Sequence, residues 1–183
     1  EQHTCGYRRA RVAVDGAACK RIAGTDDRQG YYVINGHREQ GHKNMYTGGM
    51  NTGALSTVLP ALYGTKVQTG VGEGRAWNFF VQQLVDYLGD AQLDGGCADG
   101  GWHYHPTGGN GCGTMDLSTA QWAYIGLESA EIAGKPYDVI VTNRHKFRIA
   151  NNLINNQRGD GGGAYRSSQG GSNFMITGGQ YLA

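Results

Sequence analysis

The sequence lacks the features that would place it in two large classes of protein. Its 16 basic residues nearly balance its 15 acidic ones, and the densest basic cluster is Arg8-Arg9-Ala10-Arg11. Nucleic-acid binding usually requires a concentrated basic face that neutralises phosphates. No apolar run approaches the roughly 20 residues of a membrane-spanning helix. We therefore expect neither a nucleic-acid partner nor a membrane span.

Cysteine is also scarce, and its spacing is informative. The 4 cysteines fall into two close pairs, Cys5 with Cys19 and Cys97 with Cys112. Their even number, local spacing and glycine-rich surroundings favour two disulfides, each worth about 3 kcal/mol by loop entropy. Free thiols or metal thiolates are the alternative. Disulfides would place the chain outside the cytosol, as a secreted, periplasmic or cell-surface protein.

The chain has no Asn-x-Ser or Asn-x-Thr acceptor for N-glycosylation, which favours a bacterial source over a eukaryotic secretory one. It begins at Glu1 and stops at Ala183 within an apparently helical stretch. We therefore expect a processed or trimmed piece of a longer protein.

Glycine is abundant, with 32 residues concentrated at positions 94–113 and 158–171. Within these two segments a short phrase occurs twice, as Asp99-Gly100-Gly101-Trp102-His103-Tyr104 and as Asp160-Gly161-Gly162-Gly163-Ala164-Tyr165. A phrase that returns after 61 residues in a similar context indicates a repeated structural unit.

Helical stretches flank both copies of the phrase. Apolar residues at spacings of three and four predict helices over 77–92 and 137–157, each before one copy. Further helical stretches over 117–133 and 173–183 follow the copies, and the stretch 52–62, which contains Pro60, opens the series. Asp116 suits the N-cap position of the helix that follows it. The predicted order is helix, helix, glycine-rich loop, repeated, and the predicted fold class is all-α.

Residues 1–50 show no clear period. We expect them to form an irregular N-terminal cap or insertion that the pair Cys5 and Cys19 ties down. Residues 51–183 would then contain the helical repeats.

The stretch Asp94–Pro106 followed by Asp116–Ala123 resembles the repeat of the prenyltransferase and squalene-cyclase superfamily. In that superfamily each unit is a helical hairpin that ends in a Gln-x-x-Asp-Gly-Gly-like loop. Gln157–Gly162 fits this form, whereas Gln92–Gly96 is one residue shorter. The resemblance covers about residues 50–183 and implies an α/α toroid. A closed toroid needs about six hairpins, and this chain holds about two and a half.

The repeated phrase has a structural explanation that does not depend on the resemblance. An Asp side chain can accept from backbone amides two residues on, glycine adopts the positive φ that reverses a chain, and an aromatic ring can pack over the helix ends. We assign this structural role to residues of both loops, namely Asp99, Gly100, Gly101, Trp102, Asp160, Gly161, Gly162 and Tyr165.

The motifs that carry chemistry in the superfamily are missing from this sequence. The Asp-x-Asp-Asp acid of class II terpene cyclases has no counterpart, since the nearest match is Gly24-Thr25-Asp26-Asp27. Zinc could be held by His103, His105 and Asp99, because zinc accepts such ligands when they converge tetrahedrally. Their spacing does not match the superfamily's zinc site. We therefore predict no cofactor, with zinc as the alternative.

Two classes of function remain open. The first is a non-catalytic extracellular or cell-surface module that binds another protein chain, a glycan or a copy of itself. The second is an enzyme, either a polysaccharide lyase or an isoprenoid-acting protein, whose catalytic residues lie mostly outside this piece. In a lyase, Arg144, His145 and Arg148 could serve as base and charge stabilisers. Because the catalytic motifs are missing, we favour the module. An incomplete arc of apolar helices predicts a partner chain or self-association.

Overall fold

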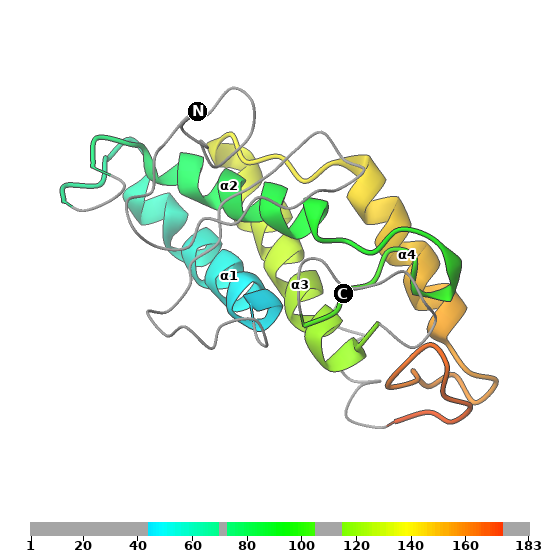
Figure 1. Cartoon of the computed structure of the whole chain (residues 1–183). Coiled ribbons are helices and arrows are strands. Elements are labelled where there is room, and N and C mark those ends of the chain that lie inside the picture. Colours follow the sequence, from blue (N-terminus) through cyan, green and yellow to red (C-terminus); the bar gives the residue numbers. More distant parts are fainter. Residues whose placement is uncertain (1–43, 70–72, 105–114, 174–183) are drawn as a thin grey trace.

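The computed structural model describes residues 44–69, 73–104 and 115–173. Its helices are α1 (Asn44–Leu62), α2 (Trp77–Asp90), α3 (Leu117–Ser129) and α4 (Asn143–Asn156), with short helical turns η1 (Gly96–Ala98), η2 (Ala130–Gly134) and η3 (Lys135–Tyr137) (Figure 1). The described residues contain isolated β-bridges but no strand, so the predicted all-α class is confirmed. The expected cap and its Cys5 and Cys19 lie outside the described residues, apart from 44–50.

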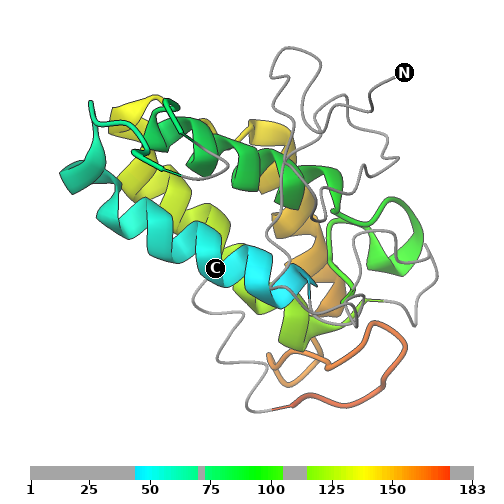
Figure 2. The same cartoon turned by 60° about the vertical axis from the view of Figure 1, so that its left-hand side comes forward.

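Helices α1 and α3 lie side by side and run in the same direction (Figures 1 and 2). Two glycines allow their close approach. A Cβ on Gly49 would lie 2.3 Å from the carbonyl oxygen of Trp122, and one on Gly126 would lie 2.6 Å from that of Gly49. Helix α1 carries no charged residue. Its Met45 and Leu59 are fully buried, whereas Met50 and Val58 are exposed.

Helix α2 is the most deeply buried of the described helices. Every residue from Gln83 to Asp90 is buried, so this helix is covered on much of its circumference. Val81, Val85 and Leu88 join the hydrophobic core, together with Trp102 of the following loop. The core therefore lies between α1, α2 and α3 and extends under the first glycine-rich loop.

The helix starts show which local predictions hold. Asp116 is the N-cap of α3, and its side chain accepts a hydrogen bond from the backbone N–H of Ser118 at 2.9 Å, as predicted. The prediction of a helix from Tyr137 is wrong for its first six residues. Helix α4 begins at Asn143 after its N-cap Thr142. The β-branched residues before it form an extended connection that buries Val139 and Val141.

Helix α1 starts at Asn44, eight residues before the stretch 52–62 that the sequence indicated. The sequence Tyr46-Thr47-Gly48-Gly49 is too polar and too rich in glycine to look helical, but packing against α3 holds it in a helix. Pro60 lies inside the helix, which ends two residues later at Leu62.

The two glycine-rich loops make corresponding contacts with the helices. The backbone N–H of Met45, at the start of α1, donates to the carbonyl of Tyr104 at 3.4 Å. The backbone N–H of Leu117, at the start of α3, donates to the carbonyl of Tyr165 at 3.0 Å. Tyr104 and Tyr165 occupy the same position of the repeated phrase. Each loop therefore returns to the first turn of a helix that precedes it in the chain.

Candidate functional site

The aspartate of the first glycine-rich loop accepts a hydrogen bond from within the loop, but the donor lies four residues before it and not two residues on. The Oδ1 of Asp99 accepts from the backbone N–H of Gly95 at 3.2 Å and from the guanidinium of Arg148 at 2.9 Å. Gly100 has a φ of 80°, a left-handed conformation that favours glycine. The hydrogen bonds and backbone conformation of a tight turn therefore explain why Asp99 and Gly100 occupy these positions.

Arg148 lies on α4, in the second hairpin, and its guanidinium forms ion pairs and a hydrogen bond with this loop of the first hairpin. Its Nη2 also lies 2.5 Å from the Oδ1 of Asp94 and donates to the carbonyl of Leu93. One turn later the Asn152 amide donates to the carbonyl of Asp99 at 2.7 Å and accepts from the hydroxyl of Tyr124 at 2.9 Å. Two polar side chains of α4 are therefore used to hold a loop of the first hairpin.

The side chain of Trp102 packs the same loop against the helices. Its side chain is fully buried, and its indole N–H donates to the carbonyl of Leu88 at 2.8 Å. The ring meets that of Tyr124 edge to face with centroids 5.5 Å apart. A Cβ on Gly101 would lie 2.5 Å from the Sδ of Met115, so a larger residue there would require the Met115 side chain to move.

The second loop differs from the first in the hydrogen bonds of its aspartate, and it is more exposed. The Oδ1 of Asp160 accepts from the backbone N–H of Gly162 at 3.0 Å, and its Oδ2 accepts from the hydroxyl of Ser172 at 2.5 Å. These two hydrogen bonds lower the pKa of the Asp160 carboxyl. Gly161 has a φ of 82°, close to that of Gly100, yet a Cβ there would meet nothing within 4 Å.

A cluster of hydroxyl groups lies at the amino-terminal ends of α1 and α3. The Oγ of Ser118 is within hydrogen-bonding distance of three tyrosine hydroxyls, at 2.5 Å from Tyr46, 3.2 Å from Tyr165 and 3.4 Å from Tyr104. It also donates to the Oδ1 of Asp116 at 2.5 Å. The tyrosines come from α1 and from both loops, so one serine joins both copies of the repeated phrase. Nothing in the sequence pattern pointed to this role of Ser118.

The surroundings of the cluster disfavour charge on Tyr104 and on its neighbour His103. The Ser118 hydrogen bond lowers the pKa of Tyr104, but burial, hydrogen bonds with Tyr165 and Tyr46 and the charge of Asp116 together raise it above its ordinary value. Burial lowers the pKa of His103; the Asp116 charge raises it, and that of Arg166 lowers it further. Tyr104 therefore remains a neutral hydroxyl at physiological pH.

The three residues considered for zinc do not form a site among the described residues. Asp99 is paired with Arg148, whereas His103 lies against the ring of Tyr104 with centroids 5.7 Å apart. His105 lies outside the described residues. The described part of the chain holds no group of three or more His, Cys, Asp or Glu side chains that suits a metal ion.

Cys97 is the one predicted disulfide cysteine within the described residues, and it is in the disulfide-bonded form. Its predicted partner Cys112 lies outside them, as do Cys5 and Cys19. The two pairings therefore stay predictions.

The three residues considered for a lyase do not converge on an open site. His145 and Arg148 are buried, and Arg148 is paired with the first loop, whereas Arg144 is exposed.

Among the helices that the structure describes, none could span a membrane.

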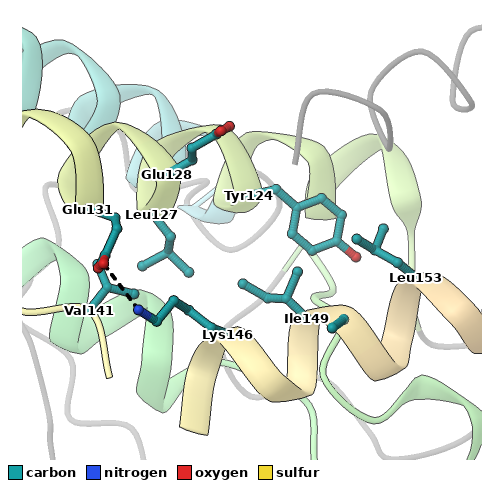
Figure 3. Close-up of a pocket in the computed structure, with 9 residues that line it drawn as sticks. Tyr124, Leu127, Glu128, Glu131, Val141, Lys146, Ile149 and Leu153 are labelled. Atoms are coloured by element: carbon teal, nitrogen blue, oxygen red, sulfur yellow. Dashed lines mark hydrogen bonds and ion pairs between the residues drawn. The ribbon is translucent and has the colours of Figure 1, made fainter. Parts of the chain in front are cut away.

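A groove of about 230 Å³ separates α3 from α4 (Figure 3). Side chains of the two helices face one another across it, and its lining is mostly apolar. The lining comprises Tyr124, Leu127, Glu128, Glu131, Val141, Lys146, Ile149, Ala150 and Leu153. At one end Lys146 forms an ion pair with Glu131 at 3.1 Å. The sequence did not predict this groove, because the helical pattern does not show how far two helices stand apart.

Comparison with known protein families, with characterised proteins and with solved structures finds no significant match to this chain.

Proposed function

We propose that this chain is a non-catalytic, extracytoplasmic module of the α/α toroid type, and that it works by binding another protein chain or a further copy of itself. The alternation of two helices and a glycine-rich loop, present twice with corresponding contacts, supports this arrangement. The disulfide-bonded form of Cys97 supports an oxidising compartment outside the cytosol.

A comparison of α2 with α4 carries the proposal. Both helices end at a C-cap, Ala91 in α2 and Gln157 in α4. The residues ten and three positions before the cap are Val81 and Leu88 in α2, which are 1% and 0% exposed. The corresponding residues of α4 are Phe147 and Ile154, which are 67% and 69% exposed. Helix α2 therefore has no exposed large apolar side chain, whereas α4 leaves Phe147 and Ile154 in solvent.

The exposed side of α4 is suited to another helix. Phe147 and Ile154 lie two helical turns apart on one face, with the exposed Ala150 between them. Ile140, in the connection that leads into the helix, is a further exposed apolar side chain at 60%. Arg144 and Lys146 border this face. A partner with an apolar helical stripe would cover the face.

Sedimentation velocity over a concentration series tests the proposal. We expect the chain to associate, alone or with a partner chain, and Phe147→Glu and Ile154→Glu to weaken association at least tenfold, because each would bury an unpaired carboxylate. Asn155→Glu is the matched control, since it adds the same charge at an exposed position of the same helix. A chain that remains monomeric at high concentration, and whose capture of any partner is unaffected by either substitution, would contradict the proposal.

An enzyme remains the alternative class, and the hydroxyl cluster is the place where it would be sought. Ser118, however, donates to the Asp116 that caps its own helix, and its Oγ is surrounded by tyrosine hydroxyls rather than by a general base. Helix capping accounts for this pair. The association surface is therefore the better-supported function.

A further inference from the structure

We propose that copies of this chain associate head to tail, with the exposed face of α1 in one copy packed along α3 in the next. This contact fills the groove between α3 and α4, and it involves helices that the structure describes. The inference rests on the proposed association and deepens it, because it names the occupant of the groove and the surface that the occupant uses.

The outer face of α1 is exposed and uncharged. It consists of Met50, Ala54, Thr57, Val58 and Ala61. Met50 and Val58 are 45% and 46% exposed, and they lie two helical turns apart with Ala54 between them. In a stack of helical repeats, an end unit remains in water when its outer face is polar. The outer face of α1 carries no charge, so it is suited to contact with a further helix.

The contacts of α1 and α3 with the two glycine-rich loops align these helices. The backbone N–H of Met45 donates to the carbonyl of Tyr104, and that of Leu117 donates to the carbonyl of Tyr165. The two tyrosines occupy the same position of the repeated phrase. Leu117 of α3 therefore corresponds to Met45 of α1, and the two helices run in the same direction (Figures 1 and 2).

The outer face of α1 corresponds to the face by which α3 packs on α1. Three residues of α3 lie against Gly49 and Gly53 of α1; they are Trp122, Gly126 and Ser129. Their counterparts in the alignment belong to the outer face of α1; they are Met50, Ala54 and Thr57. The surface that joins the second hairpin to the first is therefore also present on the first, where it is exposed.

The groove corresponds to the surface of α1 that receives α3. Thr52, Ser56 and Leu59 of α1 are fully buried. Their counterparts in α3 and η2 line the groove; they are Tyr124, Glu128 and Glu131. A helix that packs on α3 as α3 packs on α1 therefore lies along the groove. Helix α1 of a second copy is such a helix, because its outer face corresponds to the face that α3 uses.

Size and charge also match across this contact. The small side chain of Ala54 would face the larger side chains of the groove, which include Tyr124, Leu127 and Leu153. At one end of the groove Glu131 and Lys146 pair with each other at 3.1 Å, and Glu128 points away from α4 (Figure 3). An uncharged helix in the groove therefore buries no carboxylate without a partner.

The contact joins two different surfaces of the chain, so one substitution on each surface can separate them. Ala54→Glu places a carboxylate on the outer face of α1, and Ala150→Glu places one in the groove. Both alanines are exposed and glutamate is a good helix former, so both variants should fold. Circular dichroism checks the fold, and sedimentation velocity measures association.

We expect each variant alone to associate at least tenfold more weakly than the unsubstituted chain, because each would place a charge in an apolar contact. Mixed in equal amounts, the two variants should form a one-to-one dimer that grows no further. In this dimer the intact α1 of the Ala150→Glu copy packs into the intact groove of the Ala54→Glu copy. Asn155→Glu is the matched control, since it adds the same charge at an exposed position on the opposite side of α4, and it should leave association unchanged.

Self-association that either substitution leaves unchanged would overturn this inference, and so would a mixture of the two variants that recovers no dimer. Val58→Glu and Leu153→Glu provide the same readout if a first variant does not fold. A chain that remains monomeric but binds another protein chain would refute the head-to-tail contact and leave the proposed association intact. A chain that binds neither itself nor another chain would refute both.

Discussion

The guanidinium of Arg148 lies 2.9 Å from the carboxylate of Asp99 and joins α4 to the loop that ends the first hairpin. The side chain of Arg148 is 9% exposed, whereas those of Asp94 and Asp99 are 32% and 36% exposed. The cation is thus the buried member of the triad, and its two anions keep contact with water. The backbone carbonyl of Leu93 completes the set of acceptors.

Removing this cation should destabilise the fold. We expect Arg148→Met to lower the free energy of unfolding by about 2 kcal/mol, because the loop loses two ion pairs and a carbonyl loses its donor. Urea denaturation monitored by circular dichroism measures the change. Arg144→Met, at an exposed position of the same helix, should cost less than about 0.5 kcal/mol. Equal effects of the two substitutions would show that the clamp contributes nothing specific.

The two loop glycines allow backbone strain to be separated from steric conflict. Gly100 and Gly161 have nearly the same positive φ, 80° and 82°. A Cβ at Gly100 would lie 2.0 Å from the carbonyl oxygen of Arg148, whereas one at Gly161 would meet nothing within 4 Å. We expect Gly161→Ala to cost about 1 kcal/mol from strain alone. Gly100→Ala should cost at least about 2 kcal/mol more, because α4 must move away.

Thermal and urea unfolding of these two alanine variants checks the difference. Each variant serves as the control for the other, since the substitution, the φ and the position in the repeated phrase are the same. Similar losses for both would mean that α4 does not press on the first loop as described.

The Asp160 turn should respond to acid. Its carboxyl has a lowered pKa, chiefly through the hydroxyl of Ser172 and then through the backbone N–H of Gly162. Because the folded-state pKa is the lower one, the turn is stabilised above the ordinary pKa of an aspartate. That stabilisation is lost as the pH falls through the lowered value.

Carbon-13 NMR titration of the Asp160 carboxyl measures this pKa directly. Ser172→Ala should raise it toward the ordinary value, whereas Ser168→Ala, at an exposed serine of the same loop, should leave it in place. A pKa that is insensitive to Ser172 would show that the hydrogen bond is not formed in solution.

The helical content followed from the sequence because the apolar spacing is strong where helices are buried. The helix from Trp77 and the cap at Asp116 were predicted from the apolar stripe and from the preference of aspartate for N-caps. The start of α1 was missed because Gly48 and Gly49 disfavour a helix locally, and only their contact with α3 explains it. The start of α4 was placed six residues too early because the apolar residues Val139, Ile140 and Val141 continue the helical pattern without being helical.

The candidate site was harder to predict from the sequence. The structural roles of Asp99, Gly100 and Trp102 agree with turn chemistry that can be read locally. The role of Ser118 depends on tyrosines 72 and 47 residues away, and that of Arg148 on carboxylates 49 and more residues away. Such long-range pairs leave no periodic pattern, so one sequence alone does not predict them.

The contacts of α4 with the first loop also determine how the chain should unfold. Arg148 and Asn152 belong to the later hairpin, yet they hold the turn that closes the earlier one. Neither half can melt without releasing the other, so heat should produce a single cooperative transition across both. In a chain of nearest-neighbour units linked in this way, a substitution that destabilises one hairpin also destabilises the other.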